Sequence, residues 1–146
     1  MATYGLLIDY EYCTNCGSCK VSCKEEHGYP VGKTGIAVHA DGPWAIDEDN
    51  WNFNYFPLPT DLCDLCADRV AKGHEPTCVK HCQAQVLKYG DLEDLAKELA
   101  RKPKQTLFSC EAEDSTNAAR ARARPAGKRP PGAGTIKNRA HNTQQT

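Results

Sequence analysis

Short apolar runs, separated by glycine and proline, dominate the hydrophobic pattern of the chain. Residues 4–10 carry three consecutive large aliphatic side chains and predict a short buried strand. Residues 86–89 and 105–109 predict two further short strands. In residues 91–102 the leucines are spaced so that they would lie on one face of a helix. The segment begins with Asp91, which favours a helix with an aspartate N-cap.

The middle of the chain, residues 28–60, is interrupted repeatedly by glycine and proline and therefore predicts a loop. Within it, residues 36–39 and 53–56 predict two short strands. The same segment gathers five aromatic residues, Trp44, Trp51, Phe53, Tyr55 and Phe56. We expect these aromatics to cover a bound group or to pack against a partner.

Composition divides the chain into two parts. Residues 1–110 have 11 Lys/Arg and 16 Asp/Glu, a net charge of −5, whereas residues 111–146 have 7 and 3, a net charge of +4. The second part holds Ile136 as its only large aliphatic residue. This part cannot bury enough apolar surface to offset the conformational entropy that its chain would lose on ordering. We therefore predict a domain over residues 1–110, followed by a disordered basic tail over residues 111–146.

Nine cysteines in 146 residues indicate either a disulfide scaffold or a metal protein. The odd number fits a disulfide scaffold poorly. The N-terminal residues lack the features of a secretory signal, and no apolar run approaches the length of a membrane span. We therefore expect assembly in the cytoplasm, where thiols stay reduced and act as metal ligands.

Eight of the cysteines form two blocks with related spacing. The first block is C-x2-C-x2-C-x3-C, formed by Cys13, Cys16, Cys19 and Cys23. The second block is C-x2-C-x11-C-x3-C, formed by Cys63, Cys66, Cys78 and Cys82. Each block opens with C-x2-C and closes with C-x3-C, which indicates a pseudo-twofold repeat.

The spacing of the first block favours an iron–sulfur cubane over a single tetrahedral ion. Three closely spaced cysteines wrap one cluster, and the fourth ligates the other cluster in two-cluster ferredoxins. The interpretation is two 4Fe–4S clusters, with Cys13, Cys16, Cys19 and Cys82 on the first and Cys63, Cys66, Cys78 and Cys23 on the second. A zinc site remains the alternative, because zinc also takes four thiolates. We expect a helix over residues 17–28 after the first loop and another over residues 64–72.

Other candidate residues carry weaker signals. Cys110 lies outside both blocks and is expected to be a free thiol. His81 adjoins Cys82 and either tunes the first cluster or is a surface residue, while the loop histidines His27, His39 and His74 are expected to be incidental. The basic tail has no aromatic residue for base stacking, so no nucleic-acid partner is expected.

The segments "IDYEYCTNCGSCKVSCKEEHGYPVG" and "CDLCADRVAKGHEPTCVKHCQAQVLKYGDLEDL" resemble the iron–sulfur electron-transfer subunits of molybdopterin oxidoreductases, the dimethyl sulfoxide reductase family. The resemblance covers roughly residues 4–110. Members commonly carry four cysteine blocks; this chain matches the first and the last and so resembles a reduced, two-cluster version. It also has Gln83 where the family usually has proline.

The resemblance implies a fold and a role. The fold would be α+β: a ferredoxin-like, pseudo-twofold dicluster domain with small β-strands and short helices. The role would be non-catalytic, relaying electrons to or from a large catalytic subunit that holds a molybdenum or tungsten pterin. A further electron donor or a membrane anchor subunit could complete such a complex, and the final location would be cytoplasmic or follow export with a signal-bearing partner. A free soluble two-cluster ferredoxin and a zinc-binding structural protein are the alternatives.

Overall fold

The computed structural model describes residues 4–109. The elements in chain order are β1 (Tyr4–Asp9), α1 (Ser18–His27), β2 (Ile36–Ala45), β3 (Trp51–Pro59), α2 (Ala67–Val70), α3 (Thr77–His81), β4 (Leu87–Asp91), α4 (Leu92–Leu99) and β5 (Gln105–Ser109). The domain is α+β with small strands and short helices, as the sequence predicted. The predicted basic tail, residues 111–146, and Cys110 lie outside the described residues.

A three-stranded antiparallel sheet with the order β4-β1-β5 forms the centre of the domain. Side chains of β1 alternate between its two faces. A Cβ on Gly5 would lie 2.5 Å from a methyl carbon of Leu92, so the face that carries Gly5 and Leu7 meets α4. Leu6 and Ile8 point to the other face, where they pack in one apolar core with several of the cysteines.

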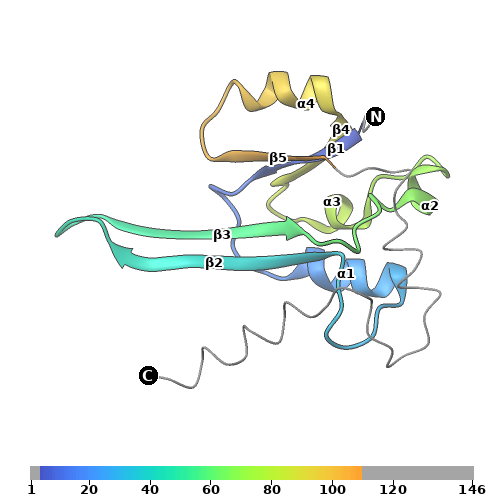
Figure 1. Ribbon diagram of the computed structural model, residues 1–146, viewed down its shortest axis with the longest axis horizontal. Coiled ribbons are helices and arrows are strands. Elements are labelled where there is room, and N and C mark those ends of the chain that lie inside the picture. The colour runs from blue at the N-terminus through green and yellow to red at the C-terminus, as the bar shows by residue number, and fades with distance from the viewer. Residues whose placement is uncertain (1–3, 110–146) are drawn as a thin grey trace.

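The helix α1 begins and ends where the sequence predicted. Gly17 precedes it with a left-handed backbone, and Gly28 ends it with φ of +61°. A left-handed residue after the last turn lets its N–H reach the orphan carbonyls of the helix, and glycine adopts this conformation at least cost. The helix α1 lies beside α3, and both lie on the side of the sheet opposite α4 (Figure 1).

The strands β2 and β3 form a long hairpin that projects from the body of the domain (Figure 1). The predicted strands over residues 36–39 and 53–56 were therefore too short, and the segment is not mostly loop. Pro57 and Pro59 are tolerated because each strand of a two-stranded ribbon has a free edge that needs no N–H donor. Gly42, with φ of +98°, permits the close strand approach at a bulge, since a Cβ there would lie 2.2 Å from the Asn52 carbonyl oxygen.

The predicted helix over residues 64–72 was also too long. The structure has only α2, because Leu65 and Cys66 take left-handed backbone conformations with φ of +54° and +53°. The helix predicted after Asp91 is confirmed. The Asp91 side chain accepts a hydrogen bond from the Glu93 N–H at 2.9 Å and so caps α4.

Candidate metal centre

The first group of thiols converges on a small enclosed cavity. Cys13, Cys16, Cys19 and Cys82 all line it. Cys13 and Cys16 come from the loop between β1 and α1, and Cys19 comes from the first turn of α1. Cys82 is the residue that directly follows α3. The cysteine that completes the group thus belongs to the second sequence block.

The backbone of the first loop explains how three near-neighbours in sequence reach one cavity. Asn15 and Gly17 both have left-handed conformations, with φ of +57° and +77°. Asparagine and glycine are the residues that adopt this region most readily. These two left-handed residues reverse the direction of the backbone twice, so that the chain coils tightly enough for Cys13, Cys16 and Cys19 to meet.

The second group forms around Cys23, which lies on α1. Cys66 and Cys78 lie near enough to Cys23 for their charges to interact. Gly35 lies between Cys23 and Cys63: a Cβ there would be 2.9 Å from the Cys23 Sγ and 3.6 Å from the Cys63 Cα. The second group thus joins Cys23 of the first block to Cys66 and Cys78 of the second, with the Cys63 backbone beside them.

The two cysteine loops have a common turn. The residue two positions after the opening cysteine is left-handed in each block, Asn15 after Cys13 and Leu65 after Cys63. An asparagine adopts this conformation cheaply, but a leucine does so at a cost. The repeated turn therefore reflects a demand of the loop geometry rather than the preference of one residue.

The environment of the thiols opposes their ionisation while no cation is bound. Burial raises the pKa of Cys19 to about 11 and that of Cys66 to about 11, and neighbouring thiols add to both shifts. Burial also raises the pKa of Cys13, Cys23 and Cys78. The pKa of the exposed Cys16 is lowered instead by its hydrogen bond to Ser18, with an Sγ–Oγ distance of 3.5 Å.

This donor set fits a metal cluster. Metal ligation requires thiolates, and several thiolates in one buried cavity repel each other unless a cation lies among them. Soft thiolate ligands select iron–sulfur clusters, zinc or copper(I) over hard ions such as Mg²⁺. The four cysteines of each group are thus the residues that would hold a cluster.

A histidine and a carboxylate adjoin the second group. His27 Nε2 lies 3.4 Å from the Cys66 Sγ and 3.6 Å from the Asp64 Oδ1. Asp64 is buried and accepts a hydrogen bond from the Cys66 N–H at 2.9 Å. The ligand atoms of these three residues lie within 4.8 Å of one another, so they are also close enough to hold a single ion.

The expectation that His27 is incidental was therefore wrong. It ends α1 four residues after Cys23, and residues at this spacing lie on the same face of a helix. That spacing was the available signal for His27. The sequence gives no comparable signal for Asp64, because nothing in its neighbouring residues indicates that its carboxylate is buried next to the second group.

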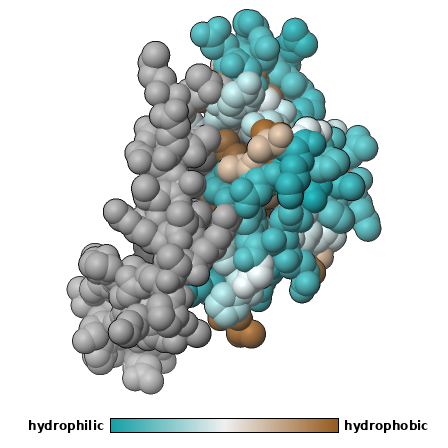
Figure 2. Space-filling model, turned by 90° about the vertical axis from the view of Figure 1, so that its right-hand side faces the viewer, coloured by the Kyte–Doolittle hydropathy of each residue, from teal (hydrophilic) through white to brown (hydrophobic). Residues whose placement is uncertain are grey.

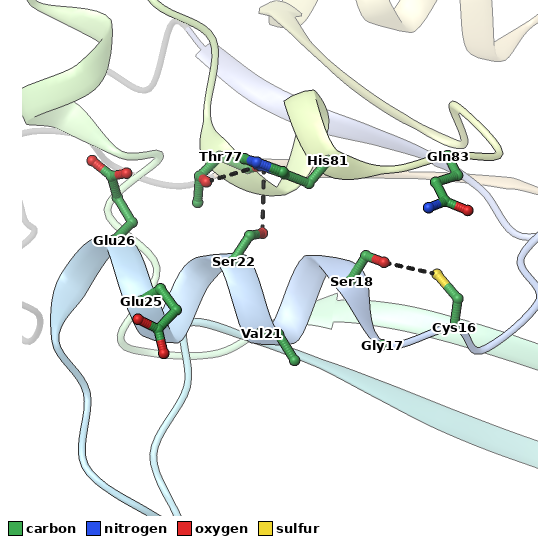
Figure 3. Close-up of a pocket in the computed structure, with 10 residues that line it drawn as sticks. All are labelled: Cys16, Gly17, Ser18, Val21, Ser22, Glu25, Glu26, Thr77, His81 and Gln83. Carbon is green, nitrogen blue, oxygen red and sulfur yellow. Dashed lines mark hydrogen bonds between the residues drawn. The ribbon is translucent and has the colours of Figure 1, made fainter.

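An open groove between α1 and α3 runs beside the first group (Figure 3). Cys16 lies at one end of the groove, and Glu25 and Glu26 lie toward the other. His81 lines the groove and donates from Nδ1 to the Thr77 carbonyl oxygen at 2.8 Å. This bond lies within α3, which favours a structural role for His81 over contact with the first group.

No helix among residues 4–109 is long and apolar enough to cross a membrane. No family model matches the chain. Several relatives are aligned over most of their length, and two of them serve as examples. One of them, a component of the polysulfide reductase of Wolinella succinogenes, is 24% identical, with 68% of this chain and 84% of that protein covered. The other, a component of the anaerobic dimethyl sulfoxide reductase of Escherichia coli, is 24% identical, with 65% and 77% covered.

A third relative matches a shorter stretch more closely. It is named as the iron–sulfur subunit of a dimethyl sulfoxide reductase of Halobacterium salinarum and is 30% identical over 83 residues, which cover 57% of this chain and 29% of that protein. The alignment with the Wolinella protein extends over 161 positions but includes only 68% of the 146 residues, about 99, leaving about 62 positions without a counterpart here. The chain is thus similar to components of the dimethyl sulfoxide and polysulfide reductases, one of them named as an iron–sulfur subunit, and this is the similarity that its cysteine motifs predicted.

Proposed function

We propose that this chain is an electron-transfer subunit that carries two 4Fe–4S clusters. The observation that carries the proposal is the crosswise grouping of the cysteines. One group takes Cys82 from the second block and the other takes Cys23 from the first, as in two-cluster ferredoxins. When bound, such clusters accept and release single electrons.

Two findings support a count of two clusters. The blocks supply eight cysteines to the described domain, and the aligned Wolinella protein has about 62 positions that this chain lacks. The missing positions agree with the absence of the two middle cysteine blocks from the sequence. The repeated left-handed turn at Asn15 and Leu65 supports the pseudo-twofold relation between the halves.

The residues around the thiols would set how easily each cluster is reduced. Burial in an apolar core disfavours added negative charge, while hydrogen bonds to sulfur favour it. The Val86 N–H lies 3.4 Å from the Cys82 Sγ, and the His27 ring lies at the same distance from the Cys66 Sγ. Both contacts would favour the reduced form of the cluster they touch. None of these roles requires acid–base or nucleophilic chemistry from the chain.

The partner would be a large catalytic subunit with a molybdenum or tungsten pterin. Each relative is named as one component of a polysulfide or dimethyl sulfoxide reductase, which denotes a larger assembly. An electron donor or a membrane anchor subunit would complete the complex. We also propose that the clusters are inserted in the cytoplasm, where the eight thiols stay reduced, and that any export follows assembly with a signal-bearing partner.

The test is anaerobic affinity purification from the native host, with iron, sulfide, zinc and molybdenum or tungsten measured on the product. We expect about eight irons per chain and a large co-purifying subunit that contains molybdenum or tungsten. The same iron content without a partner would instead identify a free ferredoxin. Zinc without sulfide would contradict both functions.

A further inference from the structure

The hairpin of β2 and β3 exposes large apolar side chains at its far end. Trp44, Trp51 and Phe53 are 51%, 63% and 50% exposed, and Ile46 in the turn is 62% exposed. Trp44 and Trp51 are the only tryptophans of the chain. Where residues 4–109 are visible on the face away from the hairpin tip, they are mainly hydrophilic, with small apolar areas among them (Figure 2). We call this projecting hairpin, residues 36–59, the arm. Exposed aromatic residues on such an arm are typical of an interaction surface.

The strand register places these side chains on both faces of the hairpin. Side chains alternate along a strand, so Trp51, Phe53, Tyr55 and Pro57 share one face. Trp44 pairs with Asn52 and lies on the opposite face. An arm that exposes an indole on each face suits a groove that encloses it, since a flat partner would leave one indole in water.

One face of the arm continues into the first cysteine group. Pro57 and its cross-strand neighbour Val38 line the cavity formed by Cys13, Cys16, Cys19 and Cys82. Tyr55 and Phe53 follow on the same face, with ring centroids 4.9 Å apart. A partner that holds this face therefore comes close to the first group.

The charge of the arm restricts the partner further. Residues 36–59 contain Asp41, Asp47, Glu48 and Asp49 and no lysine or arginine. The matching surface is an apolar groove with a basic rim. A second copy of the arm would oppose carboxylates to carboxylates. The chain's own basic segment, residues 111–146, has the right charge but offers no aromatic residue and only Ile136 as a large aliphatic.

We infer that the hairpin inserts into an apolar, basic-rimmed groove of the catalytic subunit and holds that subunit next to the first cysteine group. This inference rests on the proposed function, which supplies the partner. Buried tryptophans are frequent hot spots of protein–protein interfaces, so the two indoles are expected to dominate the affinity. The acidic turn would mainly accelerate association and confer its dependence on salt.

The test compares variants of the cluster-loaded chain, co-expressed with the catalytic subunit. We expect Trp44→Ser and Trp51→Ser each to weaken the affinity by more than about tenfold, with unchanged iron content and electron paramagnetic resonance (EPR) spectrum. The matched control is Val31→Ser, which should have no effect. Val31 is also an exposed apolar residue, at 96%, but it precedes the hairpin in the sequence and is not part of its tip. In the wild-type complex, oxidative footprinting should show Trp44 and Trp51 protected.

The possible failures are distinguishable. If no catalytic subunit associates with the wild-type chain, the proposed function is wrong. If the wild-type chain and both variants associate with the subunit equally, only the docking inference is wrong. The inference would also be overturned if the tryptophans were already protected in the isolated chain. Loss of that protection on removal of residues 111–146 would show that the basic segment covers the arm, and loss on dilution would show that a second copy covers it.

Discussion

At the scale of single residues, the cysteine thiols lie in surroundings that suit bound iron and oppose free thiolates. Cys19 and Cys66 are buried, and each has other thiols near it. A cation bound among the thiols reverses the penalty, because it converts the repelling thiolates into ligands. The free energy of metal binding is thereby coupled to the folding of the domain.

The raised pKa values predict how the metal-free chain responds to pH. Its free energy of unfolding should fall as the pH rises from about 9 to about 11. The pKa of Cys19 and Cys66 is raised from 9.0 to about 11 in the folded chain, so over this window the unfolded state holds fewer protons. Below pH 9 both states are protonated and the contribution is fully present. Denaturant titration at several pH values measures it, and constant stability across the window would contradict it.

The contact between His27 and Cys66 predicts an effect on one cluster. His27→Phe keeps an aromatic ring next to Tyr29, with which His27 stacks at 5.2 Å, but removes the hydrogen bond to the Cys66 Sγ. We expect the reduction potential of the second cluster to fall, because a donor to sulfur stabilises the added electron. Redox titration followed by EPR measures it. His74→Phe is the control, and equal shifts in both variants would contradict the assignment.

The crosswise ligand assignment predicts which cysteines share a phenotype. Cys82→Ser should perturb the same EPR signal as Cys13→Ser, and Cys23→Ser the same signal as Cys66→Ser. The reason is that each pair lies in one spatial group although its members belong to different blocks. Spectra that instead pair Cys13 with Cys23 would show that each block holds its own cluster. Cys110→Ser should leave both signals unchanged.

At the scale of elements, the structure follows the sequence where local chemistry determines it. The helix α4 has an aspartate cap and a single apolar face, and α1 ends at a glycine, so both were predictable. The hairpin was not, because its glycine and prolines indicate a loop unless the strands have free edges. The helix α2 was shortened by the left-handed turn at Leu65, a requirement of cysteine geometry that no local propensity shows.

The cap of α4 predicts a specific loss of stability. Asp91→Ala should lower the stability of the loaded domain by about 1 kcal/mol, because the Glu93 N–H loses its acceptor. Thermal unfolding under anaerobic conditions measures the difference. Asp94→Ala is the control in the same helical turn. Asp94 is an exposed residue paired with Lys97, so its removal should change the melting temperature little. Equal effects of the two variants would contradict the capping role.

At the scale of the whole molecule, the cysteine spacing indicated which residues form the candidate site but not what surrounds them. Two related blocks with C-x2-C and C-x3-C ends implied an exchange of one ligand between halves, and Cys82 lines one cavity with three cysteines of the first block. The neighbours that complete the surroundings could not be predicted in the same way. Asp64 and the aromatic arm acquire their significance from contacts between segments distant in sequence, which no local pattern encodes.

The presence of two 4Fe–4S clusters is tested most directly by the iron and acid-labile sulfide content of the anaerobically purified chain, with its EPR spectrum after reduction. Two 4Fe–4S clusters require about eight irons and about eight sulfides per chain, with spectra that show two magnetically interacting clusters. That result would support the electron-transfer role. About two zinc ions per chain, with no sulfide and no EPR signal, would contradict it, because four thiolates per group also satisfy zinc.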